Sequence, residues 1–543
     1  MTPGSSQKLG GAYLWLMSLG CLALTLALYY PALHFYFVGD DVAFVHYDPN
    51  WLRAALYPVG AWHYYPLNQI LLYVLPALSG WRPEVMHVLN LLMHAGLGVG
   101  LSLWLHRLGV DRRVCAVASV IFISRGISYE VVTWITELSY LSVVVYTLLT
   151  FSWWDRYLGG QGARYLGWTV AGFAAAVFTI EHALLLLPLY FLFDLIVRPK
   201  KSLWFHVPPR GERKRDWWRQ HRLPLLKDSM RYVPFLLVAL ALFTVKSAHH
   251  HGLVWSSMPS NGATAAAPVP PGAEVTARLP AERTWFGMLN TPRRAYLDLL
   301  LSASYLFLPI GSCYGAEDSW LTRHPWLCLL PWLVVHLWVA WKGRPVTRFL
   351  LAWVYVYMLP LALAGVPEAR YYYMATVPAA GLLGLLLHAV WSWLSRWVRV
   401  GVLGPVIVAL LALLIYGEGI FVRARLEEWK VASGLVQRTL AWLRQDLDSE
   451  TRGVYLVNLP WGVPGPFWTA YAFENAAEYL PLMLRPPRPD VRAYPVYDRS
   501  FVGGRWPTIG TYMSLEQVRE RLREPQFIAY QFVADPPRII RMR

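Results

Sequence analysis

Two adjacent acids, Asp40 and Asp41, stand in the segment "GDDVAF", directly after thirty-one residues that contain no Asp, Glu, Lys or Arg. A carboxylate within hydrogen-bond reach of a hydroxyl group can accept its proton, and two neighbouring carboxylates repel, which raises the proton affinity of one of them. The pair could therefore supply a general base, or it could be two solvated residues at a helix end. The residues around it decide between these interpretations.

Further residues able to take part in chemistry occur in separate segments of the chain. An ionisable side chain within or beside a membrane span is costly, so its presence favours a functional role. Several of them near one membrane face would form a site for a polar substrate. Besides the acid pair, the candidates are His63, Glu130, Glu137, Glu181, His182, Glu368, Arg370 and Tyr371.

These candidates also have ordinary structural interpretations. His63, in "GAWHYYPLNQI", could belong to a belt of aromatic residues at the membrane interface. Glu130 and Glu181 could cap short spans from outside. Arg370, in "EARYYY", could extend from a span end to the interface. Glu137 lies within a predicted span, which makes a purely solvated role harder to maintain.

Hydropathy indicates the elements that must hold these residues. The chain is 56% hydrophobic and 15% charged, and apolar segments of spanning length recur along it. This pattern is typical of a multi-pass α-helical membrane protein. The four cysteines have no regular spacing, so neither a disulfide framework nor a zinc site is expected. Eleven spans are predicted near residues 12–36, 85–106, 113–126, 133–153, 165–178, 183–197, 231–247, 325–341, 346–364, 371–392 and 400–421.

The basic residues orient these spans. Nine Lys and Arg lie between Arg198 and Arg222, so the loop 198–230 is predicted to be cytoplasmic. The first span then runs outward and places Asp40 and Asp41 on the outer face. The net charge of +16 is mainly a topology signal, and no nucleic-acid partner is expected.

The chain is predicted to combine a transmembrane catalytic domain, residues 1–422, with a small α/β domain on the outer face, residues 423–543. The tail opens on a helical pattern, "VRARLEEWKVASGLVQRTLAWLRQDL", followed by a strand, "GVYLVNLP", and another helix, "FENAAEYLPLML". An outer loop, residues 248–324, contains the apolar stretch 294–310, which is expected to be interfacial or re-entrant.

Five segments in the same order resemble the GT-C superfamily of membrane glycosyltransferases. "GDDVAF" is similar to the acidic pair of the first outer loop, written "FDEVHF" in the protein O-mannosyltransferases. "YYPLNQILLYVLPALSGWRPEVMHVLNLLMHAGLGVGLSLWLHRL", "YEVVTWI", "FTIEHALLLLPLYFLFDLI" and "EARYYYMATVPAAGLLG" resemble further segments of related membrane mannosyltransferases. The resemblance covers about residues 12–392.

Two positions differ from that pattern. The relatives carry Arg-Lys-Asp after the tryptophan motif, where this chain has Glu137-Leu138-Ser139, and they carry Lys before the later acid, where it has Ile180. The contacts to the donor phosphate therefore cannot be copied from the family.

The resemblance implies an inverting glycosyltransferase that moves a sugar from a polyprenyl-phosphate donor to a hydroxyl acceptor at the outer face of the plasma (inner) membrane. Asp40 aligns with the first family acid and would be the base. Asp41 would orient the acceptor, the base or a divalent cation, Mg²⁺ or Mn²⁺. Arg370 would bind the leaving phosphate, and Glu130 and Glu181 would shape the sugar pocket.

Two other functions fit the same residues. A carrier that flips a lipid-linked sugar would bind the headgroup without chemistry. A membrane scaffold would use the tail domain to bind a partner. The sequence names neither the sugar nor the acceptor.

Overall fold

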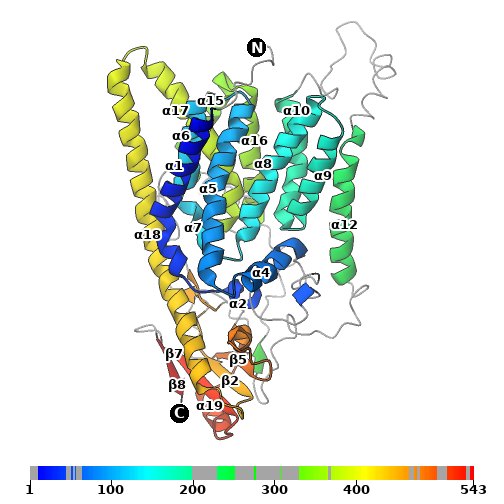
Figure 1. Cartoon of the computed structure of the whole chain (residues 1–543), viewed down its shortest axis with the longest axis vertical. Coiled ribbons are helices and arrows are strands. Elements are labelled where there is room, and N and C mark those ends of the chain that lie inside the picture. The colour runs from blue at the N-terminus through cyan, green and yellow to red at the C-terminus, as the bar shows by residue number, and fades with distance from the viewer. Residues whose placement is uncertain are drawn as a thin grey trace.

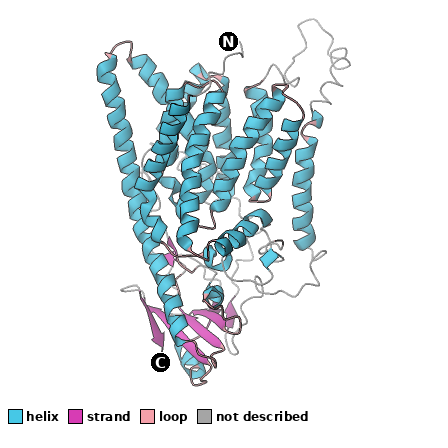
Figure 2. Cartoon of the chain, viewed as in Figure 1, coloured by secondary structure: helices cyan, strands magenta, loops and turns pink. Residues whose placement is uncertain are grey.

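The computed structural model describes residues 10–44, 51–52, 56, 64–198, 229–250, 274–276, 306, 329–364, 369–460, 462–463, 470–473, 477–497, 510–533 and 538–542. Most of these residues are helical, and most of the strands gather at one end of the molecule (Figure 2).

Long apolar helices lie side by side and form the membrane part (Figure 1). Large apolar side chains such as Trp15 and Leu413 are exposed on their surfaces, where a bilayer would cover them. The helices are α1 (Gly11–Tyr29), α5 (Pro83–Arg107), α6 (Arg112–Ser124), α8 (Leu138–Leu158), α9 (Arg164–Val177), α10 (Leu186–Ile196), α12 (Val233–His250), α15 (Leu329–Lys342), α16 (Pro345–Ala364), α17 (Ala369–Leu394) and α18 (Val400–Asp446).

Five helical stretches among the described residues are long and apolar enough to cross a membrane. A sixth span results if α6 and the short helical segment after it, which are bent by 56° at a break, count as one. The predicted multi-pass architecture is therefore confirmed, while the count of eleven stays a prediction. The five stretches are Gly11–His34, Pro83–Arg107, Pro345–Leu363, Ala369–Leu394 and Gly401–Asp446.

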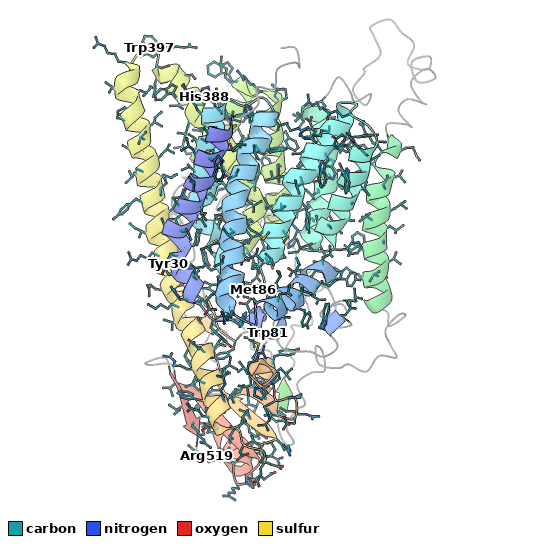
Figure 3. All side chains as sticks on the ribbon, viewed as in Figure 1. Tyr30, Trp81, Met86, His388, Trp397 and Arg519 are labelled. Carbon is teal, nitrogen blue, oxygen red and sulfur yellow. The ribbon has the colours of Figure 1, made fainter. Side chains whose placement is uncertain are left out.

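The two ends of the bundle differ in composition. Arginines lie in or next to the connections α5–α6, α8–α9 and α17–α18. An ion pair between Arg107 and Asp155 places the first two connections together, and a hydrogen bond from the Tyr13 hydroxyl to the Arg112 carbonyl adds the start of α1 to this end. We call this the basic end. Trp397, next to α18, lies at the opposite end of the molecule from Arg519 of the C-terminal domain (Figure 3).

Short helical segments occupy the opposite end, which we call the domain end. Figure 1 shows α4 lying across the ends of the long helices there, with α2 beside it. Such short pieces position loop side chains without crossing the membrane. They are η1 (Tyr30–His34), α2 (Asp40–Phe44), α4 (Pro66–Leu78), η2 (Gly126–Ser128), α7 (Tyr129–Thr133) and η3 (Glu181–Leu185).

Two helix boundaries differ from those expected. The span predicted at 133–153 begins only at Leu138, because Trp134 and the two residues after it form a buried loop. Hydropathy does not distinguish apolar residues covered by protein from those covered by lipid. The span predicted at 400–421 is the first half of α18, a continuous helix of 47 residues, so the predicted domain boundary at 422/423 falls inside a helix.

The C-terminal domain is built on a mixed six-stranded sheet with the order β1-β6-β5-β2-β7-β8. Strand β2 pairs in parallel with β5 and β7, whereas β1 and β8 add antiparallel edges. The segment 477–483, expected to be α-helical, is the 3₁₀ helix η8, and its Pro481 lacks the N–H that an α-helix needs. The strands are β1 (Glu274–Thr276), β2 (Gly453–Val457), β5 (Arg492–Tyr497), β6 (Gly510–Tyr512), β7 (Phe527–Val533) and β8 (Arg538–Met542), with α19 (Leu515–Arg521) between β6 and β7.

Candidate active site

Asp41 is the buried member of the acid pair, with 0% of its surface exposed. Its Oδ1 accepts a hydrogen bond from the Thr136 amide at 2.8 Å, and its Oδ2 accepts one from the Val38 amide at 3.2 Å. Burial raises the pKa of Asp41 to about 8, although the two amide hydrogen bonds oppose the rise. Burial therefore favours the protonated form of Asp41, and the side chain joins two loops that are distant in sequence.

Two further hydrogen bonds hold the turn that carries the acid pair. Gly39 has a φ of 51°, a conformation that glycine adopts without steric cost, and its amide donates to the Ala472 carbonyl of the C-terminal domain at 2.8 Å. The Trp134 indole Nε1 donates to the Val38 carbonyl at 3.1 Å. The position of Asp40 is thus set by both domains.

Asp40 begins α2 and is partly exposed. Its charge acts on Tyr65, the residue before α4, together with the charges of Glu137, Glu181 and Arg370. Burial is the main cause of the raised pKa of Tyr65; the three carboxylates raise it further and Arg370 lowers it. Four charged side chains from four separate segments therefore interact electrostatically with one phenol group, so these segments lie close together.

Arg370 lies in the first turn of α17 between two carboxylates. Its Nη1 is 3.5 Å from Glu137 Oε1 and 3.8 Å from Glu130 Oε1, and its backbone amide donates to Glu130 Oε2 at 3.0 Å. The guanidinium also lies 5.0 Å from the centre of the Trp134 ring and 5.3 Å from that of Tyr371. These contacts hold a cation that remains 13% exposed, with its charge shared between two acids.

Glu181 and His182 begin η3 at the same end. Glu181 Oε1 accepts from the Tyr64 amide and from Lys246 Nζ of α12, both at 3.0 Å. His182 Nδ1 lies 3.1 Å from the Tyr140 hydroxyl, and its ring packs edge-on against Tyr371. The aromatic side chains thus join the η3 segment to α8 and α17.

The structure brings most of the predicted residues together at the domain end. We call Asp40, Asp41, Glu130, Glu137, Glu181, Arg370 and Lys246 the carboxylate cluster. Glu137 is the residue before α8 rather than a mid-span residue, because the buried loop that starts at Trp134 delays the start of the helix. His63 and Glu368 lie outside the described residues.

Two members of this environment were missed by sequence reasoning. Lys246 is a cation near the end of an apolar segment, so the rule that selected Glu137 could also have selected it. Tyr65 carries no charge, and its position among charges is visible only in the fold.

The fit of a divalent cation at the acid pair can be judged from the donor atoms. Both oxygens of Asp41 already accept backbone N–H groups, and the carboxyl group is fully buried. Within the described ranges, no group of three or more His, Cys, Asp or Glu residues could hold a metal ion. Asp41 is therefore a poor cation ligand, and the divalent cation at the acid pair stays a prediction.

No protein-family model and no curated protein matches the sequence. Solved structures with a similar fold include two membrane proteins. ArnT from Cupriavidus metallidurans bound to undecaprenyl phosphate matches with a TM-score of 0.48 and 14% identity, over 97% of this chain and 94% of ArnT. The archaeal oligosaccharyltransferase AglB from Archaeoglobus fulgidus, in complex with an inhibitory peptide and a dolichol-phosphate, matches with a TM-score of 0.41 and 14% identity, over 82% of this chain and 62% of AglB.

Proposed function

We propose that this chain is a GT-C glycosyltransferase that moves a sugar from a polyprenyl-phosphate donor to a hydroxyl group of a protein, lipid or glycan on the outer face of the inner membrane. The observation that carries this proposal is the carboxylate cluster at the domain end of an apolar bundle. There, a partly exposed Asp40 shares an environment with Arg370, Glu137 and Glu181. A lipid donor would keep its tail in the bilayer and its sugar at this end.

In the proposed reaction, Asp40 accepts the proton of the acceptor hydroxyl as its oxygen bonds to the anomeric carbon. The bond from that carbon to the phosphate oxygen breaks, and polyprenyl phosphate leaves with the electron pair. Attack on the face opposite the phosphate inverts the anomeric configuration. Protonated Asp41 orients the loop without adding a second full negative charge beside the base.

Arg370 would stabilise the charge that develops on the leaving phosphate. A guanidinium can donate paired hydrogen bonds to phosphate oxygens, and such an interaction counts most where the group is held in place beforehand. Glu130 and Glu137 supply that support here. Lys246 would add a second cation beside the sugar pocket shaped by Glu181.

The C-terminal domain would form the acceptor side of the site. The Ala472 carbonyl accepts from the Gly39 amide at 2.8 Å, and η8 packs against α2, so this domain directly adjoins the acid pair. Arg485, just beyond η8, also lies 4.4 Å from the centre of the Trp81 ring, between α4 and α5. An acceptor that reaches Asp40 from outside would contact these segments first.

The test is to incubate the purified protein with a panel of polyprenyl-phosphate sugars and to measure sugar release and transfer. The matched variants are Asp40→Asn and Glu427→Gln, which changes an exposed acid of α18. We expect turnover with at least one donor, its loss in Asp40→Asn with donor binding retained, and no change in Glu427→Gln.

Other outcomes separate the alternative functions. Transport of the lipid-linked sugar between leaflets of a vesicle, without release or transfer, would establish the carrier instead. Absence of both turnover and binding for every donor would overturn the proposal. A scaffold would tolerate Asp40→Asn and Arg370→Gln, and would lose its partner when residues 423–543 are deleted.

A further inference from the structure

The helical path is interrupted between α6 and α7 (Tyr129–Thr133), just before Glu130 and Glu137 of the carboxylate cluster. Arg125 leaves the helical conformation, with φ −62° and ψ 113°, and the helical axis changes direction by 56°. A break inside an apolar bundle frees backbone N–H groups that lipid cannot satisfy, and each such group is costly unless protein binds it.

Glu418, on α18, binds a backbone amide and a guanidinium group at this break. Its Oε2 accepts from the Gly126 amide at 2.8 Å, and its Oε1 lies 3.0 Å from Arg125 Nη1. The side chains of Arg125 and Glu418 are each 2% exposed. The approach also requires a glycine, because a Cβ at position 126 would lie 2.6 Å from Glu418 Oε2 and 2.6 Å from a Phe421 ring carbon.

Two further residues of α18 follow the same segment towards the site. Arg425 donates to the Tyr129 hydroxyl at 3.1 Å, and its guanidinium lies 4.8 Å from the centre of the Tyr129 ring. The rings of Trp429 and Trp134 pack edge-on, with centroids 5.5 Å apart. Positions 418, 425 and 429 lie on one face of a helix, so this face contacts the segment 126–134 from beginning to end.

That segment carries parts of the site that must be placed accurately. Glu130 within it binds both the backbone and the side chain of Arg370. Trp134 at its end donates to the acid-pair turn and lies against the Arg370 guanidinium. A shift of the segment would therefore move the anion-binding cation relative to Asp40.

We propose that Glu418 is a positioning residue of the transferase site, which acts by binding Arg125 and Gly126 and so fixing the segment 126–134. A buried ion pair contributes little net stability compared with apolar residues of similar volume, but it is directional. The pair therefore serves placement more than stability. This inference rests on the proposed function and adds a residue that does not touch the substrate.

The test compares variants by two measurements on the purified full-length protein. One is hydrogen–deuterium exchange of the peptide that covers residues 126–134. The other is the kcat and KM of transfer with the donor that the panel identifies. The variants are Glu418→Gln, the double replacement Arg125→Met/Glu418→Met, which leaves no unpaired buried charge, and Gly126→Ala.

Matched controls lie on the same helix. Glu427→Gln changes an exposed acid of α18, and Gly419→Ala adds a methyl group that meets only Leu28 Cδ2, at 3.4 Å. Both controls should match the wild-type protein in exchange and kinetics.

We expect the double variant and Gly126→Ala to fold, with exchange in 126–134 faster by about tenfold. Their kcat should fall by about 10²-fold with the donor KM nearly unchanged, because misplacement affects the transition state more than binding. Glu418→Gln can still accept a hydrogen bond from the Gly126 amide. Its exchange rate and its kcat should therefore lie between those of these two variants and those of the wild-type protein. A folded double variant with wild-type kcat would overturn the inference.

The two proposals fail in different ways. A wild-type protein without turnover for any donor would contradict the proposed function, whatever the variants do. Normal exchange of 126–134 in the double variant would instead show that Glu418 does not fix this segment, even if the transferase is active.

Discussion

The two ends of the membrane bundle both hold buried acids, but they balance them differently. At the basic end, Asp155 and Asp194 face three arginines, Arg107, Arg198 and Arg231. The carboxylate cluster at the domain end contains five acids and two cations, of which Arg370 contacts Glu130 and Glu137 and Lys246 contacts Glu181. Asp194 is satisfied by three donors, since the Trp154 indole and the Tyr232 hydroxyl also bind it. Asp40, by contrast, is partly exposed.

This difference separates structural charge from functional charge. Acids that are paired with arginine and hydrogen-bonded on both oxygens hold helices together, as Asp194 holds α8, α10 and the residues before α12. The acids of the carboxylate cluster outnumber its two cations, and one of them, Asp40, is the base in the reaction that we propose. The ends can be distinguished experimentally because removal of an acid should affect stability at one and turnover at the other.

The largest effects on turnover and on stability should come from neutralising one acid at each end. We expect Asp40→Asn to lower the transfer rate by about 10²–10⁴-fold with little change in thermal stability, because a general base is lost. Asp194→Asn should lower the free energy of unfolding by about 3–5 kcal/mol, because Arg231 would be left as an uncompensated buried charge. Transfer assays and thermal unfolding in detergent measure both. If Asp194→Asn reduced turnover per folded molecule as strongly as Asp40→Asn, the comparison would fail.

A second effect concerns pH and depends on Asp41. Its pKa is about 8 in the folded protein against 3.8 for a solvent-exposed aspartic acid, so the folded state binds more protons between these values. Stability should therefore decline as pH rises from about 4 to about 8, by up to about 1.4 kcal/mol per pH unit, and then level off. Unfolding measured across this range should show the slope, and Asp41→Asn should reduce it. An unchanged slope in that variant would assign the titration to another group.

A smaller effect is expected for Lys246→Met. Its ion pair with Glu181 is partly exposed, so stability should change by no more than about 1 kcal/mol. Transfer should slow by about 10- to 100-fold, since a hydrogen bond to a charged group contributes about 1.5–3 kcal/mol and each 1.4 kcal/mol is a factor of ten in rate. Arg344→Met, at the basic end between α15 and α16, is the matched control and should leave transfer unchanged. Equal rates for the two variants would exclude Lys246 from the donor site.

The smallest effect should come from removal of divalent cations. Because both Asp41 oxygens already accept backbone N–H groups, we expect EDTA treatment to leave transfer unchanged. Restoration of a lost rate by added Mg²⁺ or Mn²⁺ would contradict this expectation and would return a cation to the acid pair.

Part of the site could be predicted because charge is rare in this chain. Asp40, Glu130, Glu181 and Arg370 stand out from apolar surroundings, and the basic loop after Arg198 fixes which ends of the spans they share. Each was found from its own short segment. Lys246 satisfied the same rule and was nevertheless missed.

Other features could not be read from local sequence. The boundary error at Glu137 arose because Trp134 and Ile135 are apolar residues of a loop that protein, not lipid, covers. The roles of the acid pair also depend on burial, which places Asp41 inside and leaves Asp40 partly exposed although the two are neighbours in the chain.

The sequence by itself determined that this is a multi-pass membrane protein with an acid pair directly after its first span, because hydropathy and charge act through single segments. Only the tertiary structure decided which acids are balanced and which residues hold them. Glu418 binds Gly126 across 292 positions of sequence, and Ala472 binds Gly39 from another domain. Such contacts depend on distances that the folded chain alone creates.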